Sequence, residues 1–177
     1  CEGQQWDMDF EKKETVSLDE YIRMIELKTS VLLSASLKIG AILGVSGERN
    51  QNLLYEFGRK LGIAFKVQDD YLDAFGDPQT FGKQVGGDIL ANKKTFLLIH
   101  AMESASVCQQ KELSKLLNGN EAGKVENVLQ IFRDCKVDEW ALQLKNRYLD
   151  EAFAHLEDIA VLSKRKEPLK ELAHFLV

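Results

Sequence analysis

The segment from Asn50 to Phe75 decides the fold, and it reads NQNLLYEFGRKLGIAFKVQDDYLDAF. No proline interrupts it, and its apolar residues recur at the spacing of one helix face. The segment therefore predicts a single long helix. That helix is expected to end at Gly76-Asp77-Pro78, because a proline biases the residue before it away from helical dihedrals. Gly58 and Gly62 lie one turn apart and permit the close approach of a neighbouring helix.

Helical patterns continue on both sides of this segment. Ser17-Leu18-Asp19-Glu20 is a capping box, in which the serine caps a helix start and the glutamate reaches back. The helix that begins there is expected to run to Gly44, because apolar residues recur at helical spacing: Tyr21, Met24, Ile25, Val31, Leu32, Ala35, Ile39 and Ile42.

Further helices are expected downstream of the long segment. Their ranges are about 93–102, 108–117, 122–132, 137–162 and 167–176, with a loop over 79–92 and a turn at Asn118-Gly119-Asn120. No alternating strand pattern is present. The sequence therefore predicts an all-α fold, a packed bundle of about six or seven helices.

Composition and charge limit the classes of function. The 177 residues are 45% hydrophobic and 29% charged, which suits one globular domain and argues against disorder. The 23 basic and 28 acidic residues give a net charge of −5, which argues against nucleic-acid and anionic-membrane partners. Three cysteines without metal-type spacing indicate a reducing, cytoplasmic location. No signal segment is present, and the stretch from Thr29 to Gly47 carries Lys38 and several serines, so no membrane span is expected.

Three aspartates project from one side of the long helix near its C-terminal end. At about 100° per residue, Asp69 and Asp73 lie about 40° apart, and Asp70 extends the arc to about 100°. The negative end of the helix dipole disfavours anions there unless cations offset them. Carboxylate oxygens suit magnesium, which bridges carboxylates to phosphates. A solvated acidic face is the alternative. Apolar neighbours argue against that alternative: Phe65, Val67, Leu72 and Phe75.

Lysines suited to an anion occur in two other segments. Lys28 lies on an apolar helical stripe, where its ammonium must either pair with an anion or reach water, and Thr29 adds a hydroxyl donor. Lys83, Gly86-Gly87-Asp88 and Asn92-Lys93-Lys94-Thr95 combine lysines with backbone N–H groups near a helix start, which suits a phosphate. A solvated glycine–lysine loop is the alternative. Together, the aspartates and the lysines indicate a site for a diphosphate and a metal.

The motifs resemble those of the trans-isoprenyl diphosphate synthases, the polyprenyl synthetase family that includes farnesyl and geranylgeranyl diphosphate synthases. They follow the family's order along nearly the whole chain: Gly3-Gln4 with Asp7, Lys28-Thr29, Phe65 ahead of Asp69-Asp70-Tyr71-Leu72-Asp73, Gly76-Asp77-Pro78, Gly82-Lys83, Gly86-Gly87-Asp88 and Lys93-Lys94-Thr95. The resemblance implies helices around a central cavity, a homodimer and a magnesium-dependent prenyltransferase. In that reaction an allylic diphosphate ionises, and its carbocation alkylates isopentenyl diphosphate to give a longer prenyl diphosphate.

The resemblance also assigns the metal site. Asp69 is expected to bind magnesium directly, and Asp70 and Asp73 are expected to bind it nearby or through water. Three further residues are expected to support the site: Gln4, Asp7 and Phe65.

The substrate contacts follow from the same resemblance. Lys28, Lys83 and Lys93 are expected to hold the allylic diphosphate, and Thr29 is expected to lie beside the reacting carbons. Lys66 stands where the family usually has glutamine. It is expected either to contact the diphosphate or to pair with Asp70.

One departure from the family concerns its first aspartate-rich motif. The family carries two such motifs on facing helices, and residues 1–177 contain only the second. We therefore expect these residues to be the C-terminal portion of a single polyprenyl synthetase domain, inactive alone, with the isopentenyl diphosphate site upstream of Cys1. A non-catalytic subunit of a heteromeric synthase remains an alternative, although the intact Asp69, Asp73 and Lys28 argue against it. A terpene cyclase or squalene-type synthase is the other alternative, although Lys28-Thr29 fits the elongating enzymes better.

Overall fold

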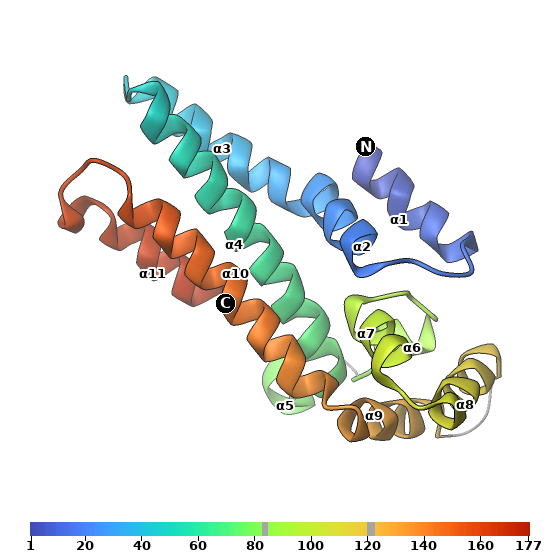
Figure 1. Ribbon diagram of the computed structural model, residues 1–177. Helices are drawn as coiled ribbons and strands as arrows, with labels where there is room; N and C mark the ends of the chain where they lie inside the picture. The colour runs from blue at the N-terminus through green and yellow to red at the C-terminus, as the bar shows by residue number, and fades with distance from the viewer. Residues whose placement is uncertain (83–84, 120–122) are drawn as a thin grey trace. The chain divides into compact units, whose positions relative to one another are not determined.

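A computed structural model describes residues 1–82, 85–119 and 123–177, which are helical nearly throughout (Figure 1). The α-helices are α1 (Glu2–Lys12), α2 (Leu18–Ile25), α3 (Val31–Leu43), α4 (Glu48–Phe75), α5 (Pro78–Phe81), α6 (Gly87–Leu90), α7 (Phe96–Ser104), α8 (Val107–Asn118), α9 (Lys124–Asp134), α10 (Val137–Glu157) and α11 (Glu167–Leu176). A π-helical turn, η1 (Glu26–Ser30), joins α2 to α3, and a 3₁₀ turn, η2 (Ser163–Arg165), precedes α11. The prediction of an all-α fold is confirmed. Within the described ranges, none of these helices combines the length and the apolarity that crossing a membrane requires.

The chain forms two compact units that draw on the same long helices. Unit 1 comprises Cys1–Asp7, Ile22–Lys66 and Leu144–Val177, and unit 2 comprises Met8–Tyr21 and Val67–Gln143. Helices α4 and α10 each contribute residues to both units. Each unit has its own buried core.

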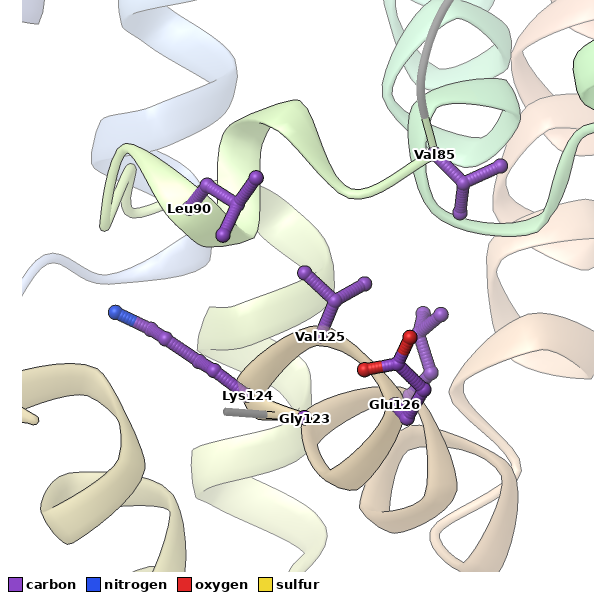
Figure 2. Close-up of a pocket in the computed structure, with 7 residues that line it drawn as sticks. Val85, Leu90, Gly123, Lys124, Val125 and Glu126 are labelled. Atoms are coloured by element: carbon purple, nitrogen blue, oxygen red, sulfur yellow. The ribbon is translucent and has the colours of Figure 1, made fainter. Parts of the chain in front are cut away.

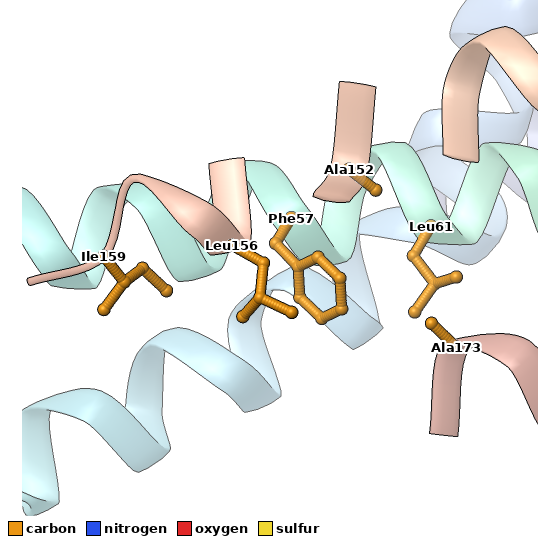
Figure 3. Close-up of a cluster of buried hydrophobic side chains, with 6 residues drawn as sticks. All are labelled: Phe57, Leu61, Ala152, Leu156, Ile159 and Ala173. Carbon is orange, nitrogen blue, oxygen red and sulfur yellow. The ribbon is translucent and has the colours of Figure 1, made fainter. Parts of the chain in front are cut away.

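The core of unit 1 lies where α4, α10 and α11 pack together. Phe57 and Leu61 of α4 are fully buried, and Figure 3 shows their side chains among those of α10 and α11. The other members of this cluster are Ala152, Leu156, Ile159 and Ala173. The two alanines are small, which lets the helix backbones approach each other. Burial of a phenylalanine or leucine contributes about 1.5–3 kcal/mol each, so this cluster anchors the first half of α4.

The core of unit 2 is built by α7, α8, α9 and the start of α10. Its largest fully buried apolar side chains are those of these helices together with one from α4: Val67, Phe96, Leu113, Val128, Phe132 and Val137. At its edge the imidazole of His100 stacks on Trp140, with ring centroids 3.7 Å apart. Burial lowers the pKa of His100, because it penalises the charged imidazolium. This histidine therefore has a packing role.

Several predicted helix boundaries are confirmed. Helix α4 ends at Phe75, where the Gly76 N–H donates to the Leu72 carbonyl at 2.9 Å. Asp77 then caps α5 by accepting the Gln79 N–H at 3.0 Å. The capping box upstream is also confirmed.

In that capping box the Glu20 N–H donates to Ser17 Oγ at 3.3 Å, and the Ser17 N–H donates to Glu20 Oε2 at 2.9 Å. The helix that begins there extends from α2 through η1 into α3.

Other boundaries differ from the prediction. The segment predicted as a loop over 79–92 contains most of α5 and all of α6. Asp77 caps the start of α5, and Pro78 occupies its first position. Helices as short as α5 and α6, in a segment rich in glycine, produce no apolar periodicity that a sequence could reveal. Helix α7 begins later than predicted, α10 ends earlier, and α1 was not predicted. Asn120, in the predicted turn, lies outside the described residues.

The π-helical turn changes which residues of the following helix are buried. An extra residue in one turn rotates everything after it, relative to an uninterrupted α-helix, by about 100°. Three apolar residues that a single helical period assigns to the core are exposed instead: Leu32 at 76%, Ile39 at 55% and Ile42 at 50%. The face that is buried from the last residue of the turn onward includes Ser30 and Ser34.

Candidate functional site

The three aspartates near the end of α4 have different surroundings. Asp70 is buried, and its Oδ2 accepts a hydrogen bond from the Tyr21 hydroxyl at 2.7 Å. Asp69 and Asp73, one turn apart, are half-buried and keep contact with solvent. The sequence treats all three as metal ligands. The structure leaves Asp69 and Asp73 as the pair more open to a cation, and it engages Asp70 in the interior of unit 2.

Asp73 holds Gly86 and the first turn of α6. The Gly86 N–H donates to the Asp73 carbonyl at 2.7 Å, and the Asp88 N–H donates to Asp73 Oδ2 at 3.0 Å. Gly86 has a φ of 81°, a left-handed conformation that glycine adopts without strain. Burial raises the pKa of Asp73, and the charges of Asp88 and Asp69 raise it further, against the opposing effects of the Asp88 N–H and Lys93.

The three lysines of the segment predicted to bind phosphate differ in what the structure shows of them. Lys93 is exposed, and its Nζ pairs with Asp88 Oδ1 at 2.5 Å. Lys94 donates to the carbonyls of Phe10 and Lys13 at the C-terminal end of α1. There a cation is favourable to the helix dipole, so Lys94 has a structural role. Lys83 lies outside the described residues.

The Lys28-Thr29 pair lies in the π-helical turn of unit 1, which packs between two glycines. A Cβ atom at Gly3 of α1 would lie 2.3 Å from the Lys28 backbone nitrogen. A Cβ atom at Gly62 of α4 would lie 2.7 Å from Ser30 Cα. The backbones of α1 and α4 therefore contact the turn directly at these two glycines. Any larger residue at either position would clash with the turn. π-Helical turns are rare and concentrate at functional sites.

Side chains at this turn are paired in two ion-pair systems. Glu26 is buried and accepts from Arg59 at 2.5 Å and from Arg23 at 3.0 Å. Lys28 Nζ donates to Asp7 Oδ2 at 2.6 Å, and about a third of each of these two side chains is exposed. The structure therefore fixes the turn through two arginines that bind a buried glutamate, and it leaves Lys28 accessible.

The remaining predicted residues are partly accessible. Gln4 is exposed on α1, Thr29 and Lys66 are half-buried, and Phe65 is 38% exposed on α4. Gln4 and Thr29 lie in unit 1 with Lys28 and Asp7, as do Phe65 and Lys66. An exposed phenylalanine directly before the aspartate segment gives this part of α4 an apolar surface.

The aspartate pair by itself supplies only part of a metal ion's coordination shell. In the part of the chain that the structure describes, no three acidic, histidine or cysteine side chains are gathered closely enough to form a ready metal cage. Asp69 and Asp73 offer carboxylate oxygens, which are the donors that magnesium takes in small number while it keeps waters and phosphate oxygens. The donor set therefore fits magnesium held partly by a phosphate ligand.

A separate pocket of about 440 Å³ lies in unit 2, and it contains none of the predicted site residues (Figure 2). Its lining comes from α6, α9 and the loop before α6: Val85, Leu90, Gly123, Lys124, Val125, Glu126 and Leu129. Val125 projects toward this loop, and a Cβ atom at Gly86 would lie 2.4 Å from Val125 Cγ1. Helix α9 thus supports the loop that Asp73 holds.

Sequence reasoning missed three features of the site. It did not identify Tyr21 as the partner of Asp70, Glu26 as the partner of Arg59, or the π-helical turn. The two pairs join residues far apart in the chain, so no local spacing indicates them. The Gly58 and Gly62 spacing was the one available signal, because it predicts the close helix approach that the turn requires.

The glycine contact at the turn leads to a stability prediction. Gly62→Ala should destabilise the protein by about 1–3 kcal/mol, because a Cβ atom would overlap the Ser30 backbone and force a shift. Gly40→Ala is the matched control, since a Cβ atom there meets nothing within 4 Å. In an exposed helix interior, that change should stabilise by about 0.5–1 kcal/mol. Urea unfolding of both variants measures the difference, and equal effects would contradict the close packing.

Comparisons with known proteins agree with the resemblance that the sequence motifs carry. The family model for polyprenyl synthetase matches residues 1–135. A short chain isoprenyl diphosphate synthase of Methanothermobacter thermautotrophicus is 34% identical over 177 residues, covering 100% of this chain and 54% of the relative. A geranylgeranyl diphosphate synthase of Saccharolobus solfataricus is 37% identical over 179 residues, covering 99% of this chain and 54% of the relative.

The fold comparison agrees with the sequence comparison. The crystal structure of a geranylgeranyl pyrophosphate synthetase from Pyrococcus horikoshii Ot3 matches with a TM-score of 0.92 and 34% identity, covering 100% of this chain and 54% of that chain. The chain thus spans about half the length of the curated relatives that it matches.

Proposed function

Because this chain belongs to the polyprenyl synthetase family, we propose that it serves in the transfer of an allylic prenyl group to isopentenyl diphosphate. In this reaction the bond between the allylic carbon and the diphosphate oxygen breaks. The resulting carbocation alkylates the double bond of isopentenyl diphosphate, and loss of a proton gives the longer prenyl diphosphate. The observation that carries the proposal is the half-buried pair Asp69 and Asp73, with Gly86 and the start of α6 held on Asp73.

Magnesium is the cation that we propose for this pair. The pKa of Asp73 is raised by burial and by the neighbouring charges of Asp88 and Asp69, so a divalent cation would offset a repulsion that is already present. Bound magnesium supplies positive charge that neutralises the departing diphosphate. We assign direct binding to Asp69 and Asp73. Asp70, held by Tyr21, supports them from within unit 2.

The diphosphate contacts are proposed from the family's motifs. Lys28 and Lys93 present exposed or partly exposed ammonium groups, which suit a multiply charged anion. We also propose contacts from Lys83 and Lys66, the former on the sequence alone. Thr29 would lie beside the reacting carbons, and apolar surface would protect the carbocation from water.

Supporting roles are proposed for Gln4 and Phe65. Gln4 offers an amide to a second cation or its water, and Phe65 offers an aromatic face to the apolar chain. The family further suggests a homodimer, which sedimentation of the purified chain would test.

Calorimetric titration with farnesyl diphosphate tests the proposal, with farnesol as the matched control ligand. Binding of the diphosphate should require magnesium, and it should be stronger than binding of the alcohol by about tenfold or more, since charge-assisted hydrogen bonds are lost with the diphosphate. Equal binding in magnesium and in EDTA would contradict the metal assignment. Addition of labelled isopentenyl diphosphate then measures the transfer step as longer labelled product.

A further inference from the structure

Lys28 already has an anionic partner within the chain, and this pairing points to a control on diphosphate binding. We propose that Asp7 is a positioning residue that competes with a diphosphate for Lys28. Its charge makes capture of the diphosphate at Lys28 depend on a divalent cation. The inference rests on the proposed function, because it takes Lys28 as a diphosphate ligand.

The position of Asp7 follows from the packing of α1. Gly3 and Asp7 are four residues apart, so they lie on the same face of this helix. Gly3 rests against the backbone of Lys28, where its missing Cβ would lie 2.3 Å from the Lys28 nitrogen. The next turn of α1 therefore brings the Asp7 carboxylate to the Lys28 side chain.

The backbone of Lys28 is fixed independently of this ion pair. Glu26, at the start of the same π-helical turn, is buried and bound by Arg59 and Arg23. Gly62 packs against Ser30 at the end of the turn. The turn is thus held at both ends, so loss of the Asp7 contact would free the Lys28 ammonium without moving its backbone.

The Asp7–Lys28 pair is suited to exchange. The Nζ to Oδ2 distance is 2.6 Å, while 35% of the lysine side chain and 34% of the aspartate side chain are exposed. Exposed pairs contribute little to stability, so a multiply charged diphosphate can displace the carboxylate. Asp7 then remains nearby as a negative charge that repels the diphosphate. A divalent cation bound to the diphosphate cancels this repulsion.

Asp7→Asn should therefore strengthen binding of inorganic pyrophosphate in EDTA. The expected increase in affinity is about fivefold, which corresponds to the upper end measured for exposed ion pairs. In magnesium the difference between variant and wild type should shrink. Asp7→Glu keeps the charge and should restore the weak metal-free binding. Glu2→Gln removes the same charge from an exposed position of α1, and it should behave as wild type.

Calorimetric titration of the full 177-residue chain and these variants, with and without magnesium, tests the proposal, and circular dichroism checks their helicity. Lys28→Ala distinguishes a failure of the role proposed for Asp7 from a failure of the diphosphate contact proposed for Lys28. If Lys28→Ala loses affinity but Asp7→Asn binds as wild type does, the role of Asp7 is wrong and the proposed function stands. If Lys28→Ala binds as tightly as wild type, Lys28 is no diphosphate ligand and both assignments fail. An equal gain from Glu2→Gln would show a general charge effect and would also overturn the role of Asp7.

Discussion

Asp69→Ala is expected to weaken magnesium-dependent binding of diphosphate by about 100-fold or more. Loss of a residue that only supports a metal ligand already costs about 10- to 100-fold in metal affinity, and Asp69 is proposed as a ligand itself. Calorimetric titration with inorganic pyrophosphate and magnesium measures the change. The helical content should stay the same, because Asp69 is half-buried and its neighbour Asp70 keeps the bond from Tyr21.

Asp134→Ala provides the matched control for that experiment. Asp134 is exposed at the C-terminal end of α9 in the same unit, so the change removes the same charge from a similar helix position. Its expected effect on binding is small. Undiminished binding by Asp69→Ala, or an equal loss in both variants, would contradict the assignment of Asp69 as the metal ligand.

Lys28→Ala should weaken binding of an allylic diphosphate by about 10- to 100-fold, because hydrogen bonds to charged groups contribute about 1.5–3 kcal/mol each. The stability of the protein should change by about 1 kcal/mol or less, since Lys28 forms a partly exposed pair with Asp7. The sequence places this ammonium on an apolar stripe, where it must either pair with an anion or reach water. In the structure it does both, because it pairs with Asp7 and 35% of its side chain is exposed.

Lys38→Ala is the control for this second variant. Lys38 lies on α3 in the same unit and donates to Asn52 at 2.8 Å, so the change removes the same charge away from the π-helical turn. Binding to Lys38→Ala should match that to wild type. If the two lysine variants bind the diphosphate equally well, Lys28 has no special contact with it.

Features that depend on neighbouring residues were predictable from the sequence. The end of α4 follows from Gly76-Asp77-Pro78, and the start of α2 follows from the capping box at Ser17. The aspartate segment at the end of α4 was predicted in the same way, since one helical period sets which carboxylates share a face.

Features that depend on contacts between distant segments were not predictable in this way. The π-helical turn is favoured by the backbone contacts with Gly3 and Gly62. The spacing of apolar residues around the turn does not indicate either contact. A regular helical period continued through the turn therefore predicts that Leu32 and Ile39 are buried, whereas the structure exposes both. The burial of Asp70 likewise depends on Tyr21, which is distant in the chain.

The π-helical turn also sets how the chain can change in length. Each residue of a helix adds about 1.5 Å of rise and about 100° of rotation, so removing one residue from Glu26–Ser30 would turn α3 onto a different side. Val31 and Ala35 would then take the places of Ser30 and Ser34, the serines that face Gly62 and Gly58 of α4. Loops absorb insertions and deletions at little cost, but this turn does not. We therefore expect a deletion in this turn to destabilise the fold more than a deletion in the segments between helices.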